Sequence, residues 1–209
     1  RLHPRPGQWR DFDRDACGFS YRDSIFRYLG AQRFVIASVT LRLSTTACPE
    51  YRYTALAAEL ERRGCVRVTP GDVFDAVVAI RSSKLPAPDQ LPNAGSFFKN
   101  PLISGEHYQR LREEFPQLVA YPQADGRVKL AAGWLLEQAG FKGQVSRGRG
   151  DGGGVGMHSA QALVLVNYGR ASSEDVLDYA ESVAAKVREL FGVGLEREPL
   201  RILEDGSRS

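Results

Sequence analysis

The chain has 209 residues, enough for one large domain or for one domain and part of another. Its 43% of hydrophobic and 25% of charged residues are typical of a soluble globular protein, and no apolar run reaches the length of a membrane span. The net charge of +3 is too small to indicate nucleic-acid binding, and the three cysteines, which share no metal-ligand spacing, favour a reduced cytoplasmic protein.

The first part of the chain is predicted to contain one strand and two helices. Residues 7–17 read as the end of a strand and its exit turn, so we expect the chain to be the later part of a longer protein. Residues 33–43 place apolar side chains at every second position, which is typical of a half-buried strand. A helix is expected over 54–63, and a second helix begins after the capping residue Thr69 and ends near Lys84.

The second part mixes further helices with strands. Helices are predicted over 105–115, over 128–140 and from the capping serines 172 and 173 to Gly192. A flexible glycine-rich loop is expected over 147–156, followed by a strand over 162–169 and a last strand over 194–203. Because strands and helices do not alternate strictly, the pattern favours the α+β class.

Two cationic motifs precede the middle of the chain. In "YRDSIF" (21–26), Arg22 is either a solvated residue of a polar turn or a planar fork for a carboxylate or phosphate. In "IRSSKLP" (80–86), Arg81 and Lys84 share one helix face. They either interact with the carboxyl end of the helix or receive a phosphorylated ligand.

Two later motifs place single side chains in unusual surroundings. In "NAGSFFKNP" (93–101), Ser96 follows a permissive glycine, and the chain lacks both a Ser-His-Asp arrangement and a nucleophile elbow. If Ser96 acts, it therefore donates or relays a proton. In "LEREP" (195–199), Glu196 and Glu198 would lie on one face of a strand, either solvated or with one carboxylate reaching into a cleft.

Five motifs occur in the order found in the bacterial UDP-N-acetylenolpyruvoylglucosamine reductases, and the chain resembles this family over nearly its whole length. They are "CGFSYRDSIF", "SKLP…NAGSFFKNP", "YPQADGRVKLAAGWLLEQAGFKG", "MHSAQALVLVN" and a late "LExE". The resemblance implies a cytoplasmic flavoenzyme of peptidoglycan precursor synthesis. Such an enzyme carries FAD and uses NADPH to reduce UDP-N-acetylglucosamine enolpyruvate to UDP-N-acetylmuramate. Hydride would pass from flavin N5 to the enol C3, and C2 would then take a proton.

The resemblance also implies three catalytic residues. Ser96 is similar to the serine that gives the proton to C2; although a hydroxyl is a poor acid, a carbanion-like centre is a strong base. Arg22 and Glu198 are similar to the pair that brackets and polarises the substrate carboxylate, which stabilises the enediolate. Here Glu198 is followed by Pro199 and Leu200 before Arg201, one position later than in many members, so no role is transferred to Arg201.

The remaining implied residues bind substrate and cofactor. Tyr53 resembles the tyrosine that closes over the uridine diphosphate and excludes water, and Lys84 and Asn100 resemble contacts to the diphosphate and sugar. Tyr21 and Arg81 would line the cleft, with Tyr21 facing the substrate and Arg81 the flavin. No metal site is expected.

The expected domain plan has a boundary after residue 85. Residues 1–85 would be the later part of the second flavin-binding domain, with the Tyr53 segment, and residues 86–209 the substrate-binding domain with the catalytic strand. The family's N-terminal FAD-binding domain is expected to be absent, so this chain alone would be inactive and the complete enzyme a monomer. Two alternatives stay open: a stand-alone UDP-sugar-binding module without redox activity, and, less favoured, a nucleic-acid-binding domain.

Overall fold

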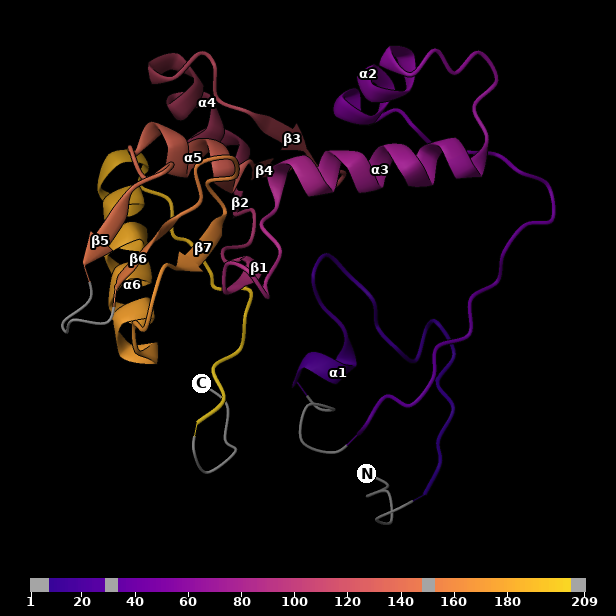
Figure 1. Cartoon of the computed structure of the whole chain (residues 1–209), viewed down its shortest axis with the longest axis horizontal. Coiled ribbons are helices and arrows are strands. Elements are labelled where there is room, and N and C mark those ends of the chain that lie inside the picture. Colours follow the sequence, from indigo (N-terminus) through magenta and orange to yellow (C-terminus); the bar gives the residue numbers. More distant parts are fainter. Residues whose placement is uncertain (1–7, 29–33, 148–152, 204–209) are drawn as a thin grey trace. The chain divides into compact units, whose positions relative to one another are not determined.

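The computed structural model describes residues 8–28, 34–147 and 153–203. Backbone contacts divide the chain into two units, residues 1–47 and 48–209, which are described separately. Both sheets of the second unit have antiparallel ladders, and helices lie between their strands in the sequence (Figure 1). This arrangement confirms the α+β class.

The first unit is organised around three phenylalanines. The rings of Phe12, Phe26 and Phe34 meet edge to face with centroids 5.2 to 6.2 Å apart. Phe26 belongs to the short helix α1 (Ile25–Tyr28), and Cys17 is buried beside the turn that precedes it. Aromatic pairs of this geometry add stability beyond the area that they bury.

The predicted strand over 33–43 is wrong for the residues that can be described. Residues 34–43 contain no helix or strand, and their apolar side chains are exposed, Val35 at 95% and Leu43 at 80%. A strand requires ladder hydrogen bonds to a neighbour, and among the described residues no backbone group bonds to this segment. The alternating pattern therefore shows the spacing of a strand, but the described residues contain no neighbouring strand that pairs with it.

The second unit begins with the two predicted helices, which pack on each other. The first, α2 (Thr54–Arg62), ends before Gly64, which has a positive φ of 70°. The second, α3 (Pro70–Lys84), opens with a capping box in which Thr69 Oγ1 accepts from the Asp72 amide and the Asp72 carboxylate accepts from the Thr69 amide. The Thr69 hydroxyl also donates to the Asp72 carboxylate at 2.6 Å, and this bond, together with the one from the Thr69 amide, lowers the pKa of Asp72. Leu56, Leu60 and Ala76 are buried between the helices.

Two antiparallel sheets follow α3. The four-stranded sheet has the order β1 (Asn93–Ser96), β7 (Val164–Asn167), β6 (Gly154–Met157), β5 (Val145–Arg147). The three-stranded sheet has β4 (Val128–Leu130) between β2 (Leu102–Ile103) and β3 (Ala120–Pro122).

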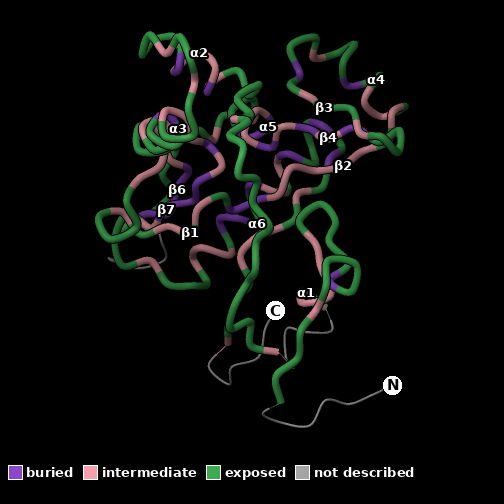
Figure 2. The backbone as a smooth tube through the Cα atoms, turned by 90° about the vertical axis from the view of Figure 1, so that its right-hand side faces the viewer, coloured by how far each residue is buried: buried purple, intermediate pink, exposed green. Residues whose placement is uncertain are grey.

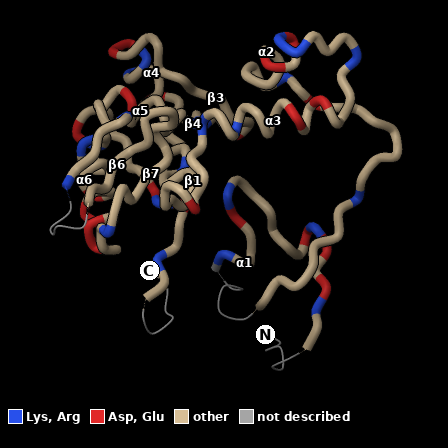
Figure 3. The backbone as a smooth tube through the Cα atoms, in the orientation of Figure 1, with Lys and Arg blue, Asp and Glu red and all other residues tan. Residues whose placement is uncertain are grey.

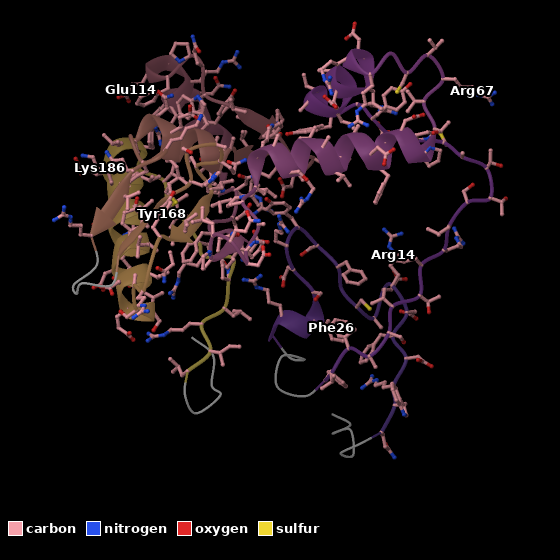
Figure 4. The ribbon with its side chains drawn as sticks, in the orientation of Figure 1. Arg14, Phe26, Arg67, Glu114, Tyr168 and Lys186 are labelled. Atoms are coloured by element: carbon pink, nitrogen blue, oxygen red, sulfur yellow. The ribbon has the colours of Figure 1, made fainter. Side chains whose placement is uncertain are left out.

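Three helices complete this unit and enclose its core. They are α4 (Gly105–Glu114), α5 (Ala132–Gln138) and α6 (Ser173–Phe191). Helix α6 packs on β6 and α5, and Figure 2 shows buried residues along β6 and β7. On its outer face Lys186 points away from the sheet and pairs with Glu189 at 2.8 Å (Figure 4). The amphipathic pattern that predicted α6 is confirmed.

Three predictions of this half need correction. Residues 128–130 are a strand, and the buried helix begins only at Ala132. The end of the expected glycine-rich loop is strand β6, while residues 148–152 lie outside the described residues. The last predicted strand is reduced to a bridge between Phe98 and Arg197 and a weak bridge position at Ile202. In each case the outcome depends on pairing with a distant segment.

The charge and hydropathy of the helices bear on two classes of partner, nucleic acids and membranes. Helices α2, α3, α4 and α6 each carry both acidic and basic residues (Figure 3). Among the described residues, no helix is both long enough and apolar enough to span a bilayer.

Candidate functional site

Ser96 lies at the end of β1, directly after an irregularity in the strand. Asn93 pairs with Val166 and Ser96 with Val164, so three steps along β1 match two steps along β7. Gly95 takes up the extra residue with a φ of 73°, and its amide donates to Asn93 Oδ1 at 2.9 Å. The bulge returns Ser96 to the same face as Asn93, where its side chain is exposed.

The two phenylalanines after Ser96 anchor this strand end in the core. Phe97 and Phe98 are 7% and 2% exposed, and their rings meet edge to face with centroids 5.2 Å apart. The Phe97 amide also donates to the Leu163 carbonyl at 2.8 Å. An exposed hydroxyl is thus carried on a segment that packing holds in place.

The segment after α6 runs antiparallel to residues 97–99. The Lys99 amide donates to the Glu196 carbonyl, and the Glu198 amide donates to the Phe97 carbonyl, both at 2.9 Å. Phe98 and Arg197 form the bridge between these bonds. This pairing places Glu198, which is half-buried, opposite the residue that follows Ser96. The structure therefore brings together the backbone segments that carry the predicted proton donor and the predicted carboxylate.

Glu196 and Glu198 have different surroundings on this segment. The register places Glu196 opposite Lys99, and their side chains form an ion pair. The Lys99 side chain is only 12% exposed, whereas that of Glu196 is 69% exposed. The sequence motifs do not assign Lys99 to the site, because its partner is 97 residues away in the sequence.

Asn100 has a structural contact that the sequence reading did not foresee. Its Oδ1 accepts a hydrogen bond of 2.9 Å from the amide of Ala132, the first residue of α5. The N-cap residue of α5, Ala131, has no side-chain cap, so Asn100 performs this function from a distance.

The three predicted binding residues of α2 and α3 differ in exposure. Lys84 is the last residue of α3 and is half-buried, and Arg81 is exposed one turn earlier. The Lys84 end of the helix is tied to β1, because Asn93 Nδ2 donates to the carbonyl of Pro86 at 3.3 Å. Tyr53 stands immediately before α2 and is 66% exposed.

Tyr21 and Arg22 belong to the other unit of the chain. They form the tip of a tight turn closed by paired backbone bonds between Ser20 and Asp23. Arg22 has a φ of 56°, which is uncommon for a residue other than glycine and costs about 1–3 kcal/mol. Backbone strain of this kind is frequent at ligand-binding positions.

A cavity of about 250 Å³ lies elsewhere in the second unit, between β5, β6 and α6. Its lining includes Asp178, Ser182 and Tyr179, and burial raises the pKa of Tyr179. None of its lining residues is a predicted site residue. Within the described residues, no group of three or more His, Cys, Asp or Glu side chains is arranged to hold a metal ion.

These features define the chain as an antiparallel α+β domain of the reductase type, because residues 87–202 match the family model "UDP-N-acetylenolpyruvoylglucosamine reductase, C-terminal domain". This match covers more than half of the chain and includes both the Ser96 and Glu198 segments. The chain belongs to the UDP-N-acetylenolpyruvoylglucosamine reductase family.

Similar proteins of that name occur in several Burkholderia species. The chain is 49% identical over 196 residues to the protein of Burkholderia orbicola (strain MC0-3), which covers 93% of this chain and 54% of that protein. It is 50% identical over 196 residues to the protein of Burkholderia multivorans (strain ATCC 17616 / 249), with the same coverage. The chain therefore spans about half the length of the curated relatives it matches.

Proposed function

We propose that this chain is the substrate-binding and catalytic part of a reductase that converts UDP-N-acetylglucosamine enolpyruvate to UDP-N-acetylmuramate, with FAD as cofactor and NADPH as reductant. The observation that carries this proposal is the backbone pairing of residues 97–99 with 196–198, which joins the Ser96 and Glu198 segments within the family match. We infer that the reaction belongs to peptidoglycan precursor synthesis in the cytoplasm and that the complete enzyme is a monomer.

Ser96 is proposed to give its hydroxyl proton to C2 of the enolpyruvyl group. Its exposed position at the end of β1 allows a substrate to approach, and the buried phenylalanines beside it limit its motion. An oriented hydroxyl loses less entropy on reaching the reactive geometry than one on a mobile loop. Gly95 leaves the approach open, since apart from its two neighbours in the chain no residue has an atom within 4 Å of the place where a side chain would begin.

Arg22 and Glu198 are proposed to bracket the carboxylate of the substrate. Negative charge develops on this carboxylate during reduction, and a guanidinium that forms paired hydrogen bonds stabilises it best. Glu198 is half-buried, so its interaction with a polar substrate group is less screened than it would be on the open surface.

The uridine diphosphate is proposed to lie along the ends of α3 and β1. Lys84 supplies a cation there, the carboxamide of Asn100 supplies N–H donors, and Tyr53 supplies an exposed ring that closes over the nucleotide. Tyr21 completes the substrate contacts.

Arg81 is proposed to contact FAD at one margin of its site. When bound, FAD supplies the hydride. On α3 the exposed guanidinium of Arg81 is suited to a flavin phosphate or ring oxygen. The chain spans 54% of the length of its relative from Burkholderia orbicola. We therefore propose that most FAD contacts come from the part of the relatives that this chain does not span, and that the chain alone is inactive.

The test separates the two half-reactions of the complete reductase by stopped-flow absorbance. Ser96→Ala should leave reduction of the enzyme by NADPH unchanged and abolish its reoxidation by the enolpyruvyl substrate. Ser159→Ala, which removes another exposed serine, is the matched control and should change neither step. Equal loss in both half-reactions would contradict the role of Ser96. A wild-type protein that binds the UDP-sugar but has no turnover would instead favour the non-redox binding module.

A further inference from the structure

We propose that the ion pair between Lys99 and Glu196 is a positioning device that fixes the register of the Glu198 segment against the Ser96 segment. The inference rests on the proposed function, because the ion pair would position two residues of the proposed site, Ser96 and Glu198. Neither Lys99 nor Glu196 was among the residues to which the family resemblance assigned a role.

The pairing that joins the two segments is short. It consists of the single bridge between Phe98 and Arg197 with one hydrogen bond on each side. The segment after α6 contains no named strand among its described residues, so no longer ladder supports this bridge. A pairing of this length has little cooperativity, and a slip of one residue would place every side chain on the opposite face.

Glu198 is the residue that such a slip would displace. In the observed register Glu198 lies opposite Phe97, and Glu196 lies opposite Lys99. Because side chains alternate along an extended segment, both glutamates occupy one face and Arg197 the other. A slip of one position would exchange these faces and bring Arg197 or Pro199 to the place of Glu198.

The burial of Lys99 makes the ion pair selective for one register of the two segments. Its side chain is 12% exposed, and a charged side chain with so little exposure is stabilised by an anionic partner. The pair connects positions 97 residues apart, whereas exposed pairs such as Lys142 with Glu137 connect neighbours in the sequence. In the slipped register the residue opposite Lys99 is Arg197 or Leu195, and neither can neutralise the ammonium. Of these three registers, only the observed one therefore places a carboxylate opposite Lys99.

Four variants of the complete reductase test the proposal. Lys99→Met removes the charge but keeps the length of the side chain, and Lys99→Arg keeps the charge. The double variant Lys99→Glu with Glu196→Lys exchanges the partners. Lys142→Met is the matched control, since it breaks the pair with Glu137 at the end of α5. Turnover is expressed per bound flavin, so that loss of folded enzyme does not count as loss of activity.

Lys99→Met should lower kcat by about 10- to 100-fold, the scale expected when a reacting group is displaced by about 1 Å, and should change KM much less. Lys99→Arg should retain most of kcat, and the exchanged pair should recover at least part of it. Lys142→Met should match the wild type. An unchanged kcat in Lys99→Met would overturn the proposal, as would an equal loss in Lys99→Met and Lys99→Arg.

Hydrogen exchange tests the register without turnover. In Lys99→Met the amides of Lys99 and Glu198, which form the two bonds of the bridge, should exchange at least about tenfold faster. The Phe97 amide, which bonds to Leu163, should keep its wild-type protection. Unchanged protection of all three amides would overturn the positioning role even in an active enzyme. If the wild type itself has no turnover, the proposed function fails while this measurement still decides the register.

Discussion

Replacement of Asn100 separates a structural contact from a predicted substrate contact. The oxygen of its carboxamide accepts from the first amide of α5 at 2.9 Å, whereas the nitrogen is the group proposed to bind the nucleotide. Asn100→Ala removes both groups. Asn100→Asp keeps an acceptor for the helix and replaces the N–H donors with a second oxygen.

The loss of stability expected for Asn100→Ala follows from the position of α5, the helix that Asn100 caps. Loss of an N-cap side chain typically costs about 1 kcal/mol and up to about 2 kcal/mol. We expect the upper part of this range because α5 buries Ala132, Leu135 and Leu136 completely, so its first turn cannot fray without disturbing the core. For a chain of this length, about 1–2 kcal/mol lowers the midpoint of thermal unfolding by about 2–8 °C.

Thermal unfolding by circular dichroism and calorimetric titration with the UDP-sugar provide the two measurements. Asn100→Asp should unfold at or above the wild-type temperature at pH 7, because a carboxylate at a helix N-terminus is favourable. The same variant should bind the UDP-sugar at least about tenfold more weakly, since a carboxylate repels the diphosphate. An equal loss of stability in the Asp and Ala variants would refute the capping role. Wild-type affinity in Asn100→Asp would refute the substrate contact.

Two further substitutions test packing and pH dependence. Gly156→Ala should destabilise the fold by at least about 1–3 kcal/mol in urea unfolding, because the new methyl group would lie 2.8 Å from the Cα of Val145 and closer still to Gln144 O. Gly194→Ala, where the methyl group has open space, should cost far less, and similar losses would contradict this reason. Hydrogen bonds from two arginines of its own helix end lower the pKa of Glu59 from 4.5 to about 2. Because the lowered pKa favours the folded state, that contribution is complete above pH 4.5 and is lost as the pH falls through about 2. Glu59→Gln should therefore reduce the loss of α2 helicity on acidification, and an identical acid titration would contradict the assignment.

The helices were predictable because their ends are specified locally. Thr69 with Asp72, and Ser172 with Asp175, form capping boxes within four residues of sequence, and the Ser104 cap needs only His107. These signals need no distant partner. The three helices that carry these caps accordingly agree in position with the prediction.

The strands depended on contacts that no local pattern contains. Residues 128–130 have a helix-compatible sequence but lie between β2 and β3, whose ladders decide their conformation. Gly154 and Gly156 disfavour a strand by propensity. The two glycines are nevertheless required in β6, because any side chain there would collide with strand β5 or with Gln144, the residue that precedes β5. Residues 34–43 show the opposite case. Their sequence has the alternation of a strand, but no described residue forms a ladder with them.

The sequence motifs supply the predicted members of the site but only part of their arrangement. The motif order identified the Ser96 and Glu198 segments, and the structure pairs their backbones. The ion pair of Lys99 with Glu196 and the cap that Asn100 gives to α5 connect residues 97 and 32 positions apart. A single sequence contains no periodicity or spacing that reports such contacts.

The bulge in β1 makes the length of this segment as important as its composition. Three steps from Asn93 to Ser96 match two steps on β7, so the strand contains one more residue than a regular ladder would hold. Loss of that residue would restore the regular ladder and remove the local bend and twist that the bulge imposes beside Ser96, although Ser96 would keep its partner Val164 and every remaining side chain would be unchanged. Among natural variants of this protein, insertions and deletions between these two residues should therefore be rarer than substitutions of the alanine between them.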